Sequence, residues 1–200
     1  MGLSDDAILA AHRSGDPKAF ESLVRRHGGR VLAHLERLTG KRDEAEDAFQ
    51  ETFRRVHERS GQYRGDGQLV SWMLTIATNV VRDNWRRRSR QRQHQADRPT
   101  VSLTSLAAND GADPELVDTR EKQPAEIAMD QEQRQQIRAA VASLPPRQRA
   151  VLVLAYYEGL SYADVAATLG CGVGTVKTQM FRAVRTLGRK LRRLEGATNG

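Results

Sequence analysis

Apolar residues recur every three or four positions along most of this 200-residue chain, a spacing that predicts amphipathic helices. Long alternating runs of β-branched residues, which would predict strands, are absent from the sequence. The stretches predicted to be helical are a short one after Ser4, 17–39, 43–59, about 68–92, about 128–144, 147–158, 162–169 and 175–193. We therefore expect an all-α protein.

Capping and breaking residues set the ends of these helices. Ser4 and Asp16 have the side chains that accept hydrogen bonds at a helix N-terminus, and Pro17 suits the first helical position. Gly40 is expected to end the second helix, and Gly28-Gly29 marks a weak point or kink inside it. Segment 61–67 (GQYRGDG) has the composition of a loop, and Pro145-Pro146 interrupts the later helices.

The stretch 161–194 has the pattern of a helix-turn-helix. Ser161 can cap a first helix, Gly170 can end it in a left-handed conformation, and a longer helix follows. Cys171 and Val173 are interpreted as small apolar plugs at the turn.

The apolar stripe of the longer helix is Val176, Met180, Ala183, Val184, Leu187, Leu191 and Leu194. Lys177, Thr178, Phe181, Arg182, Arg185 and Arg189 point away from that stripe. Two helices at a tight turn, the second with a basic face, are typical of duplex DNA binding, although a plain helical hairpin with a solvated face has the same pattern.

Charge is distributed unevenly along the chain. The formal net charge is +7, which favours a polyanionic partner such as nucleic acid. Residues 82–98 hold seven basic and two acidic side chains, whereas 99–131 hold two basic and seven acidic ones. Residues 132–200 are basic again, with eleven basic and four acidic side chains. Two basic blocks separated by an acidic spacer predict two anion-binding modules and a flexible tether.

The end of the helix predicted over 68–92 carries five arginines within residues 86–92. Such a run repels itself on an isolated helix, so phosphate is its natural partner, although a solvated helix end is the alternative. Asn79 and Asn84 lie near this basic face, where amides can hydrogen-bond to base edges. Trp85 is either an exposed stacking platform for bases or part of the core.

Other classes of protein are disfavoured by what the sequence lacks. Cys171 is the only cysteine, so no intramolecular disulfide forms and a reducing compartment is expected. The first residues lack the basic and apolar segments of a signal peptide, and no apolar run is long enough to cross a bilayer. There is no P-loop, and the five histidines share no ligand spacing. We expect a cytoplasmic protein that is not an enzyme, has no metal or other cofactor and does not insert into a membrane.

Three stretches together resemble one protein family. Residues 43–57 (DEAEDAFQETFRRVH) are similar to the core-polymerase-binding helix of bacterial sigma-70 family sigma factors, of the compact extracytoplasmic-function (ECF, group IV) type. Residues 64–88 (RGDGQLVSWMLTIATNVVRDNWRRR) resemble the family's helix that reads and melts the −10 element. Residues 144–183, which begin LPPRQRAVLVLAYYEGLSYADV, resemble its −35-reading domain.

The resemblance implies roles for individual residues. The positions implied to contact the clamp helices of the large polymerase subunit are Asp47, Gln50, Glu51 and Arg54. Those implied to capture −10 bases, separate the strands or hold their phosphates are Tyr63, Arg64, Asn79, Asp83, Asn84, Arg86, Arg87 and Arg88. Those implied to enter the major groove at the −35 element are Thr175, Lys177, Thr178, Phe181, Arg182 and Arg185.

The resemblance also implies a domain organisation. Residues 1–95 would form the polymerase-binding and −10 domain, 96–129 a flexible acidic linker, and 130–196 the −35 helix-turn-helix domain. The implied function is promoter-specific initiation with core RNA polymerase and promoter DNA as partners. Many members of the family are also held by an anti-sigma factor, although nothing in this sequence identifies one. A stand-alone helix-turn-helix regulator is the alternative, and it leaves the acidic face of 43–59 unexplained.

Overall fold

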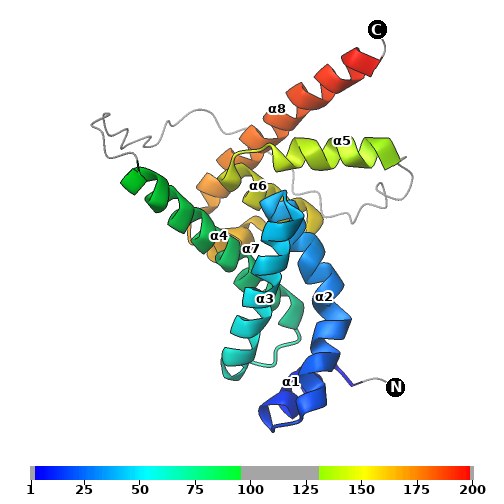
Figure 1. The fold of residues 1–200 in the computed structure, drawn as a ribbon, viewed down its shortest axis with the longest axis vertical. Helices are drawn as coiled ribbons and strands as arrows, with labels where there is room; N and C mark the ends of the chain where they lie inside the picture. Colours follow the sequence, from blue (N-terminus) through cyan, green and yellow to red (C-terminus); the bar gives the residue numbers. More distant parts are fainter. Residues whose placement is uncertain (1–2, 96–130, 199–200) are drawn as a thin grey trace.

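The computed structural model describes residues 3–95 and 131–198, and every regular element in these two ranges is helical (Figure 1). The elements are α1 (Asp5–Arg13), α2 (Pro17–Thr39), α3 (Arg42–Glu58), the 3₁₀ turn η1 (Ser60–Gln62), α4 (Leu69–Gln95), α5 (Gln131–Ala142), α6 (Pro146–Leu152), the π-helical segment η3 (Val153–Tyr157), α7 (Tyr162–Leu169) and α8 (Val173–Thr198). The predicted all-α class is confirmed. The linker predicted over 96–129 lies outside the described residues, so it stays a prediction.

Local capping chemistry accounts for most helix ends. The side chains of Ser4, Asp16 and Ser161 each accept a hydrogen bond from a backbone N–H in the first turn of the helix that follows. Gly40 and Gly170 take left-handed conformations with φ of 72° and 63°. Residues with a Cβ rarely adopt that conformation, so a glycine at each position ends its helix without strain.

Several boundaries differ from the sequence prediction. Helix α3 begins at Arg42 rather than Asp43, and α8 begins at Val173 rather than Thr175. The helix predicted over 147–158 is divided into α6 and η3, because its last turn widens to hydrogen bonds between residues five apart. The backbone N–H of Glu158, for example, donates to the carbonyl of Val153 at 3.1 Å. Glu158 thus follows directly on this wider turn.

Gly28 allows two helices to approach closely. Helix α2 runs through the glycine pair without interruption. A Cβ placed on Gly28 would lie 3.4 Å from Cζ of Phe49 on α3, tighter than most packing contacts. The glycine therefore serves the packing of α2 on α3.

The first half of the chain packs α1 to α4 around a common interior. Leu23, Val56, Met73 and Val80 are among its fully buried side chains. Trp85 is half-buried and packs against this core, which favours the core interpretation over an exposed stacking platform. The apolar faces predicted for these helices are the faces that meet.

The second half packs α6, α7 and α8, with α5 along α8. Val176, Met180 and Ala183 are buried as predicted, but Val184 is 55% exposed and Val173 is 41% exposed. Both predictions of burial were wrong, since helical spacing does not fix how much of α8 its neighbours α5, α6 and α7 cover. In the described ranges, α8 included, we find no helix with the length and apolarity needed to cross a membrane.

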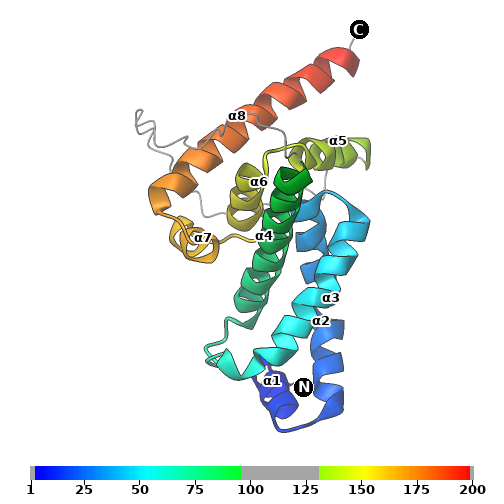
Figure 2. The ribbon, with the colours of Figure 1, turned by 60° about the vertical axis from the view of Figure 1, so that its left-hand side comes forward.

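The two halves are in direct contact, which the sequence does not predict. Helices α5 and α6 and the segment η3 pack on α2, while α7 packs on α4. Figures 1 and 2 show α5 to α8 at the end of the α2–α4 bundle that is opposite to α1, with the C-terminal part of α8 projecting away. The contact brings the helix-turn-helix onto the helix that carries the arginine run.

Leu23→Ala tests the packing of the first half. Leu23 is fully buried, so we expect the substitution to lower the free energy of unfolding by about 2–5 kcal/mol. Urea denaturation followed by circular dichroism measures the change. Leu3→Ala is the matched control, because Leu3 is 63% exposed and its loss should change stability by less than about 0.5 kcal/mol. Equal effects of the two substitutions would contradict the described core.

Candidate functional site

One face of α3 carries the residues predicted to bind polymerase. Asp47, Gln50 and Arg54 are exposed, and Glu51 is partly exposed. Because residues three and four apart share a helix face, the four side chains form one surface. Opposite them, Ala48, Thr52 and Phe53 are buried against the bundle. The packing of α3 thus presents this polar face to solvent.

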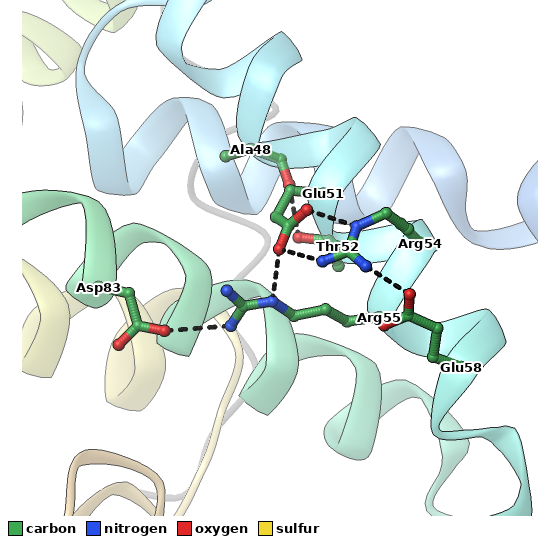
Figure 3. Close-up of polar contacts among 7 residues, drawn as sticks. All are labelled: Ala48, Glu51, Thr52, Arg54, Arg55, Glu58 and Asp83. Carbon is green, nitrogen blue, oxygen red and sulfur yellow. Dashed lines mark hydrogen bonds and ion pairs between the residues drawn. The ribbon is translucent and has the colours of Figure 1, made fainter.

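Glu51 lies in an ion-pair network (Figure 3). Its carboxylate accepts hydrogen bonds from Arg54 at 2.7 and 2.8 Å and from Nε of Arg55 at 2.7 Å. The hydrogen bond from Arg54 is the largest effect on this group, and together with Arg55 it outweighs partial burial and lowers the pKa of Glu51 to about 2. Arg54 also pairs with Glu58. Glu51 is therefore held ionised and in a fixed orientation.

Arg55 links this face of α3 to α4. Its guanidinium contacts Glu51 through Nε and Asp83 through Nη1, the latter at 3.1 Å, and its side chain is 14% exposed (Figure 3). The spacing of four residues from Glu51 signals the first contact. No local pattern signals the contact with Asp83, which is 28 residues away.

The arginine run at the end of α4 is exposed. Arg86, Arg87 and Arg88 all reach solvent, and Arg88 pairs with Glu44 of α3 at 2.7 Å. An exposed ion pair of this kind contributes little to stability, so the Arg88 guanidinium can leave Glu44 and bind a phosphate at low cost. The arginine run at the end of α4 therefore remains able to bind an anion.

Tyr63 lies in the interior rather than on the surface. It is 5% exposed, its ring packs 5.5 Å from that of Trp72, and its hydroxyl donates to Asp6 at 2.9 Å. Burial and the Asp6 carboxylate raise the pKa of Tyr63 to about 12. Tyr63 thus anchors the loop to α1, and in this structure it does not present a ring to a base. Arg64, next to it, is exposed.

Asn79, Asp83 and Asn84 of α4 are all partly buried. Asp83 is held by Arg55. The side-chain oxygen of Asn79 is buried and has no hydrogen-bond partner among the described residues. A buried acceptor without a donor is costly, and such groups often mark a place where a partner binds.

The second helix of the helix-turn-helix presents the other predicted surface. Its six predicted −35 residues are all exposed: Thr175, Lys177, Thr178, Phe181, Arg182 and Arg185. They occupy the side of α8 opposite Val176, Met180 and Ala183, which pack on the domain. Phe181 is 44% exposed beside two arginines, an unusual setting for a large aromatic ring. The face offers cations, hydroxyls and an apolar contact, which are the groups that read a major groove.

A set of buried polar residues joins the two halves of the chain. His34 of α2 is fully buried, and its ring nitrogens lie 3.1 Å from Oε1 of Glu158 and 3.0 Å from Oγ1 of Thr78. Glu158 also pairs with Arg30 at 3.2 Å. Burial alone would raise the pKa of Glu158, but the bonds from His34 and Arg30 outweigh it and hold that pKa below its ordinary value. No local sequence pattern signals the contacts of these residues.

Arg149 forms the second buried contact between the halves. Its Nη1 donates to the carbonyls of Leu38 and Thr39 at 3.0 and 2.9 Å, and its Nη2 donates to Leu144. The guanidinium thus satisfies carbonyls at the C-terminus of α2, where the helix dipole favours a cation. A Cβ on Gly40 would lie 2.8 Å from that of Ala142, so the halves meet closely here.

Two family models match the chain. The model of sigma-70 region 2 matches residues 23–91, and the model of sigma-70 region 4 matches residues 134–187. The first match contains α3 and most of α2 and α4, and the second contains α7 and much of α8. The candidate surfaces on α3 and α4 therefore lie within the first matched region, and the candidate surface on α8 lies within the second.

Relatives of similar length align over most of the chain. ECF RNA polymerase sigma factor SigM of Mycobacterium tuberculosis is 34% identical over 197 residues, which is 98% of this chain and 89% of that protein. SigE of Mycolicibacterium smegmatis is 37% identical over 87% of this chain, and the chain spans 63% of the length of that relative. The ECF sigma-E factor of Escherichia coli is 29% identical over 96% of both chains.

Solved structures share the fold. The sigma factor RpoE of Bartonella quintana, solved in complex with the anti-sigma factor NepR, is 26% identical with a TM-score of 0.62 over 88% of this chain and 98% of that one. CnrH, solved with the cytosolic domain of CnrY, is 23% identical with a TM-score of 0.58 over 94% of this chain and 97% of that one. The helical arrangement is thus shared with solved proteins at low sequence identity.

The network around Glu51 predicts a specific pH dependence. The pKa of Glu51 is about 2 in the folded protein, below the ordinary value of 4.5. The ionised Glu51 carboxylate therefore stabilises the fold fully above about pH 4.5, and this contribution to the free energy of unfolding is lost as the pH falls toward 2. In Arg54→Met we expect the pKa to rise toward 4.5, measured by NMR titration of the Glu51 carboxyl. Arg25→Met, an exposed arginine of α2, is the control and should leave that pKa unchanged. An unchanged pKa in Arg54→Met would refute the pairing.

Proposed function

The chain belongs to the extracytoplasmic-function group of the sigma-70 family of RNA polymerase sigma factors, and we propose that it binds core RNA polymerase and directs it to specific promoters. The observation that carries this proposal is the presence of both family regions, in order, on one chain. Each region has exposed polar side chains that can bind a partner, on α3 and the end of α4 in the first region and on α8 in the second. A protein that reads two DNA elements and contacts polymerase needs both regions.

We assign polymerase docking to the exposed face of α3. The proposed contacts are Asp47, Gln50, Glu51 and Arg54. Arg55 fixes the orientation of Glu51, so the docking carboxylate is ordered before polymerase arrives. Preorganisation of this kind lowers the entropic cost of association.

We assign −10 recognition to α4 and to the loop before it. Arg86, Arg87 and Arg88 would hold backbone phosphates, and Arg64 is an exposed cation on the adjacent loop. Asn79, Asp83 and Asn84 would contact bases that leave the duplex. Tyr63 contributes by anchoring the loop, since its ring is buried.

We assign −35 recognition to the exposed face of α8. Lys177, Arg182 and Arg185 would bind guanine edges or phosphates. Thr175, Thr178 and Phe181 can contact thymine methyl groups and base edges from the same face. This half would place the protein on the duplex, while the first half opens it.

The remaining assignments follow from family membership. Sigma factors act as initiation factors, so we propose a non-enzymatic role in the cytoplasm, without a cofactor. Bartonella RpoE was solved in complex with the anti-sigma factor NepR, and we propose a partner of that kind for this chain. A stand-alone helix-turn-helix regulator remains the second candidate, and it differs from a sigma factor in needing no polymerase contact.

Run-off transcription with core polymerase and a genomic DNA library tests the proposal. We expect the protein to associate with core and to yield discrete transcripts. Glu51→Lys reverses a docking charge, so it should weaken core association by about tenfold or more, measured by fluorescence anisotropy. Glu21→Lys, which reverses an exposed carboxylate of α2, is the control and should bind at full strength. DNA binding without core association or transcripts would favour the stand-alone regulator.

Alanine substitutions on α8 test the −35 assignment. Lys177→Ala, Arg182→Ala and Arg185→Ala should each cost about 1–3 kcal/mol where a base is read, and about one unit of salt slope where a phosphate is bound. Holoenzyme binding to a promoter fragment across a salt series measures both quantities. Arg25→Ala removes an exposed cation of α2 and should change neither. Wild-type affinity and salt slope in all three variants would rule out insertion of this face into the groove.

A further inference from the structure

Helix α1 holds both ends of the loop before α4, which comprises residues 63–68 (YRGDGQ). The Asp6 carboxylate accepts a hydrogen bond from the hydroxyl of Tyr63 at 2.9 Å and, through its other oxygen, one from the backbone N–H of Gly67 at 3.2 Å. The guanidinium of Arg13 donates to the backbone carbonyl of Tyr63 at 3.1 Å. One helix thus fixes the first residue of the 63–68 loop and the last but one.

These hydrogen bonds come from a helix that is itself firmly placed. Ile8 and Leu9 of α1 are buried in the core of the first half, and the Ser4 side chain caps the helix. The match to sigma-70 region 2 begins at residue 23, after the end of α1. A loop inside the matched family region is therefore held by a helix that lies outside that region.

The 63–68 loop has little packing of its own to define its shape. Residues 64–68 are all exposed. Gly65 and Gly67 have φ of 73° and 74°, and a Cβ placed on either glycine would meet no atom within 4 Å. Glycines in open space can take several backbone conformations, so packing does not select the observed one. Hydrogen bonds from α1 therefore restrain the loop where burial does not.

A restrained loop matters most for discrimination between bases. Arg64 is exposed on the loop, in the part of the protein proposed to read the −10 element. A contact with a phosphate is mainly electrostatic and tolerates a displaced cation. A hydrogen bond to a base edge needs the correct distance and angle, so it weakens when the loop moves. Loosening the loop should therefore reduce base discrimination more than overall DNA binding.

We propose that Asp6 and Arg13 are positioning residues for recognition of the −10 element. Neither residue touches DNA; both hold the 63–68 loop in the shape that presents Arg64 to the bases. Helix α1 then sets how strictly the protein distinguishes −10 sequences. The inference rests on the proposed function, because only a reader of the −10 element needs an ordered loop at this place.

Amide hydrogen exchange tests the positioning without polymerase or DNA. In Asp6→Ala the N–H of Gly67 loses its acceptor, so we expect its exchange, measured by NMR, to accelerate by about tenfold or more. Asp5→Ala is the matched control, because Asp5 lies on the same helix but pairs with Arg26 and His27 rather than with the loop. Gly67 should exchange at the wild-type rate in that control. Equal exchange in Asp6→Ala and the wild type would contradict the proposal.

Promoter discrimination tests the functional consequence. The templates are a promoter recovered in the genomic run-off assay and a panel of its single-base substitutions in the −10 and −35 elements. Each mismatch should weaken binding of the wild-type holoenzyme by about 5- to 150-fold. In Asp6→Ala we expect this ratio at one or more −10 positions to fall by about two- to tenfold, the range for one lost hydrogen bond. The ratios at −35 positions should stay unchanged.

Further variants separate positioning from stability. Asp6→Asn keeps a side-chain oxygen that can accept from Tyr63, so it should retain more −10 discrimination than Asp6→Ala. Arg13→Met removes the donor to the Tyr63 carbonyl and should change the −10 ratios in the same direction as Asp6→Ala. Asp5→Ala should keep the wild-type ratios at every position, including under conditions where its thermal stability is lower.

Unchanged −10 ratios in folded Asp6→Ala would overturn the proposal. An equal loss of discrimination at −10 and −35 positions, or the same loss in Asp5→Ala, would also overturn it, because general destabilisation would then explain the effect. Absence of transcripts and of core association with the wild-type protein would instead refute the proposed function, whatever the exchange rate of Gly67.

Discussion

Two buried charges, the Arg149 guanidinium and the Glu158 carboxylate, determine how the two halves of this protein are arranged. Neither finds enough partners within its own half. Arg149 needs the last carbonyls of α2, and Glu158 needs His34 and Arg30 of the same helix. A buried charge without a partner is strongly unfavourable, and the packing of the second half on α2 gives both residues hydrogen-bond partners. The position of α7 on α4 follows from that docking.

The arrangement connects three surfaces that would otherwise act separately. Helix α3 carries the proposed polymerase contacts, and Arg55 joins its Glu51 to Asp83 of α4. Helix α4 in turn meets α7 through Thr75 and Arg82. The polymerase face, the −10 face and the helix-turn-helix are thus linked through successive polar contacts.

Local chemistry made much of the fold predictable from the sequence. The helices begin at Ser4, Asp16 and Ser161 and end at Gly40 and Gly170 because those caps and glycines act within a few residues. The six exposed residues of α8 were identified from helical periodicity and family resemblance. Val184 was placed wrongly because periodicity gives a face but not the width that neighbouring helices cover.

Long-range contacts were not predictable from the sequence. Tyr63 was expected at a DNA surface, but its loop folds back so that its hydroxyl meets Asp6, 57 residues away. The pairing of Arg55 with Asp83 and of His34 with Glu158 likewise depends on helix packing rather than on spacing. Polar residues at such contacts have the same sequence pattern as solvated ones, so only the packed structure distinguishes them.

Three surfaces of this sigma factor, on α3, α4 and α8, are proposed to bind core polymerase, the −10 element and the −35 element. The most direct measurement is a cryo-EM structure of the protein with core polymerase and promoter DNA. It should show the Glu51 face of α3 on polymerase, the Asn79 side of α4 facing the −10 strand, and the exposed face of α8 in the groove of the −35 element. An initiating complex in which these faces contact neither polymerase nor DNA would contradict the assignment.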